Sequence, residues 1–263
     1  MHILKIGGGA TINIEGIISD LAETALPALI ILGANAARDD IALRLGLPKK
    51  VITSVSGYDS VFSDENALDV IMMSYAGLRS KRVVELCQKN GLNAVGLSGL
   101  DGRLIQGQRN RGIRVRENGK NLIKHDLSGK PKSTNQSLLR WLLNNNYLPV
   151  ITIPIVDEKG FAINSENDDI INVLQEQIGA EKIIQFIEAP GYLDDKEDEN
   201  SLIDQLSISE LHVKETQSVG RIKRKLLALT RLFAAGAAEV VITDGRTEHP
   251  LRDALAGMGT NIR

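Results

Sequence analysis

The sequence predicts an α/β protein built on a mostly parallel sheet, and three features of its 263 residues lead to that prediction. The chain opens as strand, helix, strand and helix, an alternation typical of a parallel sheet. The second strand, residues 29–32, is an uninterrupted apolar run of the kind that is buried on both faces of such a sheet. The length suits one large domain or two closely joined lobes.

The opening strand, residues 2–6, contains one lysine, Lys5, and is followed by three glycines. A lysine within a short apolar strand is costly to bury without an anion. Backbone N–H groups in a glycine turn form a concavity that binds anions. The stretch therefore suits a phosphate site beside a cation, and an edge strand with a solvated lysine is the alternative. There is no Walker motif, and Ile12 stands where a dinucleotide fingerprint needs its third glycine.

The spacing of apolar residues predicts the next three helices. A helix is expected over residues 15–26, where Pro27 ends it, and another leads from the Gly33-Ala34-Asn35 turn to about Gly46. Ser63 is expected to cap a long helix over residues 64–90. Such a helix is about 40 Å long, and its several apolar faces suit either a dimer interface or a buried central helix.

The second half of the chain continues the alternation. Residues 103–132 break into short alternating segments, with Asn118-Gly119 as a hairpin turn. Trp141 is expected in the core, and Ser165 is expected to open a helix. A fresh strand–helix series near residue 180 suggests a boundary between lobes 1–179 and 180–263. The other strands are expected at residues 92–97, 148–153, 161–163, 182–187 and 239–243, and the other helices at 134–145, 165–179, 220–235 and 251–256.

Composition and motif content give no indication of a nucleic-acid-binding, secreted, membrane-spanning or structural-metal protein. Charged residues make up 24% and the formal net charge is −2, which does not suggest a nucleic-acid partner. The single cysteine, Cys87, excludes an intramolecular disulfide and fits a reducing compartment. No secretory signal is visible and no apolar run approaches the ~20 residues that span a bilayer, so a cytoplasmic protein is expected. No Cys/His cluster suggests a structural metal.

Two polar stretches add to the candidate phosphate site. Residues 164–169 place several acids at a helix start, and the helix dipole explains only one or two of them. Residues 220–225 place four cations at another helix start, where cations are disfavoured, so a bound anion would explain them. Phosphoryl transfer requires positioning and cations around the transferring group. The acidic stretch 194–204 is expected to be a solvated loop.

Four motifs together resemble the amino acid kinase family over almost the whole chain: Lys5-Ile6-Gly7-Gly8, residues 94–102, residues 220–225 and Gly257-Met258-Gly259-Thr260. Within the family they are similar to acetylglutamate kinases and, more closely, to aminoadipate kinases whose substrate is carried by the amino-group carrier protein LysW. The resemblance implies a three-layer αβα sandwich of the carbamate kinase-like fold. It also implies an N-terminal lobe for acyl substrate, carrier and dimerisation, and a C-terminal lobe for ATP.

The resemblance implies roles for individual residues. Lys5 and Lys225 would contact the transferring phosphoryl group, and Asp168 would orient them. Asn164 and Ser63 would bind the acyl substrate. ATP and its phosphates would be held by Gly7, Gly8, Gly33, Asp244 and Gly245, together with Arg246 and the Pro190-Gly191 turn. The resemblance further implies Mg²⁺, bound chiefly through the nucleotide phosphates, and a homodimer rather than the arginine-regulated ring.

Three positions depart from the family pattern. Leu32-Gly33-Ala34 stands where the family has His-Gly-Gly, so the second glycine is missing. Val61 stands where the family has an arginine that grips the substrate carboxylate. Ile187-Glu188 replaces a small polar pair, which would place Glu188 near phosphate.

The leading interpretation is an ATP-dependent carboxylate kinase. It would form an acyl phosphate on LysW-linked 2-aminoadipate or glutamate, in lysine- or arginine-type biosynthesis. One alternative is an acetylglutamate kinase or another acidic amino acid kinase, and a second is a catalytically weak relative that binds carrier or nucleotide. Lys5, Asp168 and Lys225 favour the enzymes, whereas the three departures favour the weak relative.

Residues 103–132 are strongly basic, with nine cations against two anions, a surplus of seven in a chain whose net charge is −2. An acidic protein partner such as the carrier would be attracted to this field. A solvated edge is the alternative, and the lack of interleaved aromatics speaks against nucleic acid. The expected docking residues are Arg109, Arg111, Arg114 and Arg116.

Overall fold

The computed structural model describes residues 1–53, 55, 59–117, 120–218, 220–237 and 239–263, and for residues 59, 60, 117, 220–222 and 224 the backbone alone. The main-sheet strands are β1 (His2–Ile6), β2 (Ala28–Leu32), β5 (Ala94–Gly99), β6 (Ile105–Arg109), β9 (Gly129–Thr134), β10 (Leu148–Val156), β11 (Ala162–Ile163), β12 (Lys182–Ile187), β13 (Gln205–Leu206), β14 (Val240–Asp244) and β15 (Thr260–Ile262). Two separate hairpins are β3 (Val51–Thr53) with β4 (Asp59–Val61), and β7 (Ile113–Glu117) with β8 (Lys120–Lys124).

The helices are α1 (Ile14–Thr24), α2 (Asn35–Arg44), α3 (Glu65–Ile71), α4 (Ser80–Lys89), α5 (Gln136–Asn144), α6 (Asn167–Ile178), α7 (Ile208–Gln217), α8 (Gly220–Ala234) and α9 (Pro250–Leu255). A π-helical segment, Met72–Arg79, joins α3 to α4, so the long helix expected from residue 64 to 90 is present. Short 3₁₀ turns occur at Asp101–Arg103 and Glu199–Ser201.

The sheet follows the order β13-β15-β14-β12-β1-β2-β10-β6-β9, with β5 and β11 also paired to β10. Strand β1 lies near its centre and pairs in parallel with both β2 and β12. Antiparallel pairs join β14 to β15, β6 to β9 and β10 to β11. The predicted mostly parallel sheet is confirmed, and it runs without interruption through the expected boundary near residue 180.

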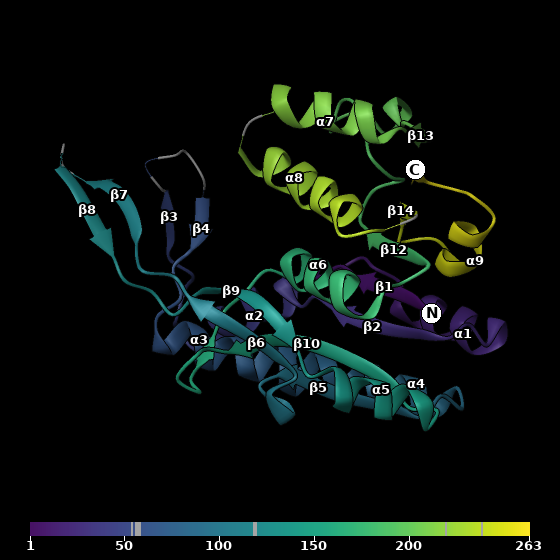
Figure 1. Cartoon of the computed structure of the whole chain (residues 1–263), viewed down its shortest axis with the longest axis horizontal. Coiled ribbons are helices and arrows are strands. Elements are labelled where there is room, and N and C mark those ends of the chain that lie inside the picture. The colour runs from purple at the N-terminus through teal and green to yellow at the C-terminus, as the bar shows by residue number, and fades with distance from the viewer. Residues whose placement is uncertain (54, 56–58, 118–119, 219, 238) are drawn as a thin grey trace.

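Two buried apolar clusters lie on opposite faces of this sheet. One joins Ile3 of β1 to α3, α5, α6, α7 and α8, and the other joins Leu4 and Ile6 to α1, α4 and α9. Successive side chains of a strand point to opposite faces, so β1 contributes to both clusters. Figure 1 shows the helices on the two sides of the sheet, which confirms the expected three-layer sandwich. Among the described residues, every helix is too short or too polar to span a lipid bilayer.

Three local expectations were wrong. Asp64, rather than Ser63, caps α3, because its carboxylate accepts from Ala67 N at 3.0 Å. Trp141 is 56% exposed and stacks on Tyr147, because Leu139 and Leu142 occupy the inner face of α5. Helix α6 has Glu166, not Ser165, as its N-cap residue.

The acidic stretch is exposed over residues 194–200, as expected of a solvated loop, and includes the 3₁₀ turn Glu199–Ser201. Its carboxylates reach basic side chains in two places, Asp194 with Lys214 at 2.7 Å and Glu199 with Arg246 at 2.8 Å. Helix α7, which follows it, was not expected, although Ser207 and Glu210 form a capping box. The expected turn at residues 118–119 lies outside the described residues.

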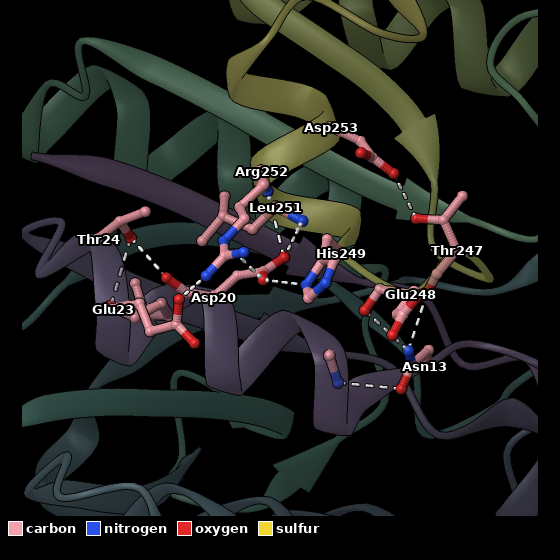
Figure 2. Close-up of polar contacts among 12 residues, drawn as sticks. Asn13, Asp20, Glu23, Thr24, Thr247, Glu248, His249, Leu251, Arg252 and Asp253 are labelled. Carbon is pink, nitrogen blue, oxygen red and sulfur yellow. Dashed lines mark hydrogen bonds and ion pairs between the residues drawn. The ribbon is translucent and has the colours of Figure 1, made fainter.

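Helices α1 and α9 are tied together by a fully buried carboxylate, Asp20 (Figure 2). It accepts from Leu251 N at 3.0 Å and Arg252 N at 3.2 Å, and it contacts the His249 ring at 3.0 Å. At the other end of α1, Asn13 donates to Thr247 O at 2.8 Å. The exit of the first glycine turn is therefore anchored to the segment after β14.

Candidate functional site

The candidate site lies at the carboxyl ends of the central parallel strands, where ligands of open α/β sheets bind. Gly7 follows β1, Gly33 follows β2 and Glu188 follows β12. Backbone bonds join these ends, since Gly7 N donates to Phe186 O at 3.0 Å and Gly33 N donates to Ile6 O at 2.8 Å. The topology thus gathers turns that are far apart in the sequence.

Lys5 points to the face of the sheet that α6 covers. Its Nζ forms an ion pair with Asp168 in the first turn of α6, and it lies 3.4 Å from Gln185 Oε1 on β12. The lysine side chain is only 15% exposed. The structure therefore brings together two residues that the resemblance assigned to the reaction, and it supplies the anion that a lysine in a buried strand requires.

The two turns after β1 and β2 interlock through their backbones. A Cβ on Gly8 would lie 2.4 Å from Asn35 N, and a Cβ on Gly33 would lie 2.7 Å from Gly8 N. Ala36 N also donates to Gly8 O at 2.8 Å. Glycine is required at both positions because any side chain would separate the turns. The second turn therefore faces the first, as the sequence suggested.

Ala34 replaces the family glycine at the start of α2. Its φ of −147° lies outside the left-handed region that favours glycine, and its side chain is buried. Gly33, the first glycine of the pattern, is retained where the two turns meet.

Glu188 lies at the first turn, as expected. Its carboxylate accepts from Thr11 N at 2.8 Å and Thr11 Oγ1 at 2.7 Å, directly over Gly9, where a Cβ would be 2.0 Å from the carboxylate carbon. The hydrogen bonds from Thr11 lower the pKa of Glu188 below its ordinary value. A permanent anion therefore borders the proposed phosphate site.

Several polar side chains lie near the N-terminus of α6. Asn164 Nδ2 donates to Ser63 Oγ at 2.9 Å, and Ser63 is fully buried. Ser165 Oγ and Asn167 Oδ1 are buried with no hydrogen-bond partner among the described residues. Unpaired buried polar atoms are costly, so a ligand that bonds to them is favoured. The resemblance had singled out Asn164 and Ser63, whereas Ser165 and Asn167 were not predicted as site residues.

Tyr75 was not predicted as a site residue, because its role depends on contacts between distant segments. Tyr75 lies in the π-helical segment. Its hydroxyl donates to Oδ1 of Asn35, the first residue of α2, at 2.6 Å. The tyrosine is buried, so the second turn, α2 and the long helix are held in one arrangement.

The basic helix start lies on α8, which packs against α6. Lys225 is exposed, and further along α8 Arg231 approaches Asp169 at 3.7 Å. Near the end of β14, Asp244 accepts three bonds from Arg246, while Gly245 N donates to Ile187 O at 2.8 Å. Asp244, Gly245 and Arg246, which the resemblance assigned to ATP, thus lie around the ends of β12 and β14.

The basic hairpin β7–β8 projects from the body of the molecule beside β3–β4 (Figure 1), and Val55 N donates to Arg114 O at 2.8 Å. Arg114 and Arg116 are exposed on either side of buried Val115. Arg111 is exposed in the preceding turn. Arg109 differs, because its guanidinium pairs with Asp157 at 3.0 Å and lies over Phe161.

Comparison with known proteins adds to this geometry. A family model described as the amino acid kinase family matches residues 1–244. A [LysW]-aminoadipate kinase of Thermus thermophilus is 37% identical over all of both chains, and an acetylglutamate kinase of Methanopyrus kandleri is 28% identical, also over all of both. The solved N-acetylglutamate synthase of Neisseria gonorrhoeae superposes with a TM-score of 0.78 at 19% identity, over 99% of this chain and 58% of the synthase.

Proposed function

Because this chain belongs to the amino acid kinase family, we propose that it transfers the γ-phosphoryl group of ATP to a side-chain carboxylate. The substrate is 2-aminoadipate or glutamate attached to an amino-group carrier protein like LysW, and the product is an acyl phosphate for lysine or arginine biosynthesis. The observation that carries the proposal is the Lys5–Asp168 ion pair beside two interlocked glycine turns.

Each part of this arrangement suits phosphoryl transfer. The Lys5 ammonium would neutralise charge on the transferring group, and Asp168 holds it in place. Gly7, Gly8 and Gly33 would let backbone N–H groups approach the phosphates, since no side chain intervenes. Lys225, from α8, would approach the same group from the nucleotide side. The attacking carboxylate oxygen forms the new P–O bond as the bond to ADP breaks.

The interlocked turns are proposed to bind the phosphates of ATP through backbone N–H groups, and glycine at Gly8 and Gly33 lets the two turns approach each other closely. Asp244, Gly245, Arg246 and the Pro190-Gly191 turn are proposed to hold the rest of the nucleotide. Mg²⁺ is proposed to be held chiefly by the nucleotide phosphates. When bound, Mg²⁺ would neutralise phosphate charge.

The proposal divides the chain at residues 179 and 180, with acyl substrate and carrier on residues 1–179 and ATP on residues 180–263. Asn164 and Ser63 would bind the acyl group, and the basic hairpin would dock the acidic carrier. A cytoplasmic homodimer is also proposed. Exposed Met73 and Leu78 on the π-helical segment are apolar residues that such an interface would cover.

A kinetic comparison of two substrates tests the proposal. Carrier-linked 2-aminoadipate should give a kcat/KM for ADP formation at least tenfold above that of N-acetylglutamate. The opposite ranking would indicate the acetylglutamate kinase alternative. No ADP formation with either substrate, in protein that binds ATP, would support the weak relative.

A further inference from the structure

The missing substrate arginine leaves a chemical problem. Under the proposed function the substrate has two carboxylates, of which one is phosphorylated and the other must be bound as an anion. Val61, the last residue of β4, offers no charge for that anion. A buried carboxylate without a partner is strongly disfavoured, so another cation close to the site would favour its binding.

Arg38 is the candidate for such a cation. It follows Asn35 by three residues on α2, so both side chains share one face of the helix. That helix begins at the Gly33-Ala34 turn and packs against α3 and the π-helical segment. The Arg38 side chain is 15% exposed, whereas that of Arg44, at the other end of α2, is 74% exposed.

Arg38 lies near Tyr75 and Glu166, close to the residues proposed to bind the acyl substrate. Burial raises the pKa of Tyr75, the positive charge of Arg38 lowers it and the negative charge of Glu166 raises it, so both groups lie near this hydroxyl. Tyr75 itself bonds to Asn35 at 2.6 Å. Arg38 and the starts of α2 and α6 therefore lie around the Tyr75 hydroxyl.

Arg38 is incompletely neutralised by its neighbours. Its Nε and Nη2 both donate to Asp39 Oδ1, at 2.9 and 2.8 Å, and Lys49 approaches Asp39 Oδ2 at 2.7 Å. Two cations thus share one carboxylate at the positive end of a helix dipole. Among the described residues Arg38 Nη1 donates to no acceptor, which leaves it available to an oxygen of a ligand.

We propose that Arg38 binds the substrate carboxylate that is not phosphorylated, and so replaces the arginine that the family carries at the position of Val61. This inference rests on the proposed function. A guanidinium suits the role because its planar fork matches a carboxylate. The competing explanation is that Arg38 only fixes the start of α2 through Asp39.

Binding of two ligands distinguishes these explanations. The carrier is linked either to 2-aminoadipate or to its α-carboxamide analogue, and binding to the full-length protein is measured by calorimetry with a non-hydrolysable ATP analogue and Mg²⁺. The wild type should prefer the carboxylate about tenfold or more, as expected for a hydrogen-bonded charge. Arg38→Gln should bind both ligands equally, because the group that recognises the carboxylate is gone.

Matched variants complete the test. Arg44→Gln, on the same helix, should keep the full preference. Adding Val61→Arg to Arg38→Gln should restore part of it. If Arg38→Gln does not fold, Arg38→Lys serves instead, and its preference should fall at least threefold because lysine lacks the fork.

An undiminished preference in Arg38→Gln, or in Arg38→Lys where that variant is needed, would overturn the inference and leave the proposed function standing. A wild type that binds neither ligand while binding the ATP analogue would overturn the proposed function and this inference with it.

Discussion

The interlocked glycine turns and the basic hairpin are both proposed to contact substrates, but they are built in opposite ways. The turns lie at the carboxyl ends of the central strands, are held by backbone hydrogen bonds, and stand beside a lysine that is 15% exposed. The hairpin projects into solvent with exposed arginines (Figure 1). Charges in a water-poor site act strongly, whereas exposed charges are screened. The turns should therefore control the chemical step, and the hairpin should control encounter with the carrier.

Removal of the Lys5 charge should have the largest effect. Lys5→Ala should lower kcat by about 100-fold or more, the size seen when one preorganised electrostatic group is lost. Turnover should be measured under saturating substrates, with unfolding followed by circular dichroism. Lys225→Ala should behave similarly. Normal kcat in both variants would remove the lysines from the mechanism.

Substitution in the interlocked turns should come next. Gly8→Ala places a Cβ 2.4 Å from Asn35 N, so the turns must separate. Overpacking of this kind costs roughly 1–3 kcal/mol, and we expect both thermal stability and kcat to fall. Ala34→Gly is the control, since it adds no atom between the turns, and it should change stability by only about 0.5–1 kcal/mol. Equal effects of the two variants would contradict the interlocking.

Charge reversal on the hairpin should act on carrier binding alone. Arg111→Glu, Arg114→Glu and Arg116→Glu together should raise the KM for the carrier at least tenfold, with an unchanged Kd for ATP. In the wild type this KM should rise with salt, because exposed charges are screened beyond ~8–10 Å.

A control triple variant carries the same change of net charge elsewhere. It combines Arg44→Glu, Arg82→Glu and Lys89→Glu, all at exposed positions. Its KM for the carrier should stay near the wild-type value. If both triple variants raise KM equally, overall charge and not the hairpin would be responsible.

Glu188→Gln should have the smallest effect. Loss of a negative charge beside the phosphates should tighten MgATP binding by about fivefold at most, the scale of one Coulomb contact near water. The pKa of Glu188 lies below its ordinary value of 4.5, so its ionised form contributes fully above that value and is lost only as pH falls through the lower, folded value. The ratio of wild-type to variant Kd should therefore stay constant between about pH 6 and 8. A ratio that changes in this range would mean that Glu188 titrates there.

Much of the fold was predictable, because strands such as β1 and β2 are short, mainly apolar runs bounded by turn residues. Such runs are typical of buried strands in a parallel sheet. Helix α7 was missed because Leu211 is its single buried residue, so it lacks a strong apolar face. Its capping box was a usable signal. Trp141 was misplaced because periodicity indicates a helix but not which residues its neighbours cover.

The candidate site was predictable only where one motif contains the signal. The glycines after β1 and the lysine before them predict an anion site within one short motif. Lys5 and Asp168 are 163 positions apart, and only the family resemblance paired them. The surroundings of Arg38 were invisible, because they depend on how α2 packs against Tyr75. Local chemistry can be read from the sequence, whereas convergence of distant side chains requires the fold.

The most direct test of the account is chemical trapping of the product. The protein is incubated with MgATP, carrier-linked 2-aminoadipate and hydroxylamine, which converts an acyl phosphate to a stable hydroxamate that mass spectrometry detects on the carrier. The account predicts one hydroxamate per ADP in the wild type, on the side-chain carboxylate, and about 100-fold less in Lys5→Ala. ADP release without hydroxamate, or hydroxamate formation that Lys5→Ala leaves unchanged, would contradict it.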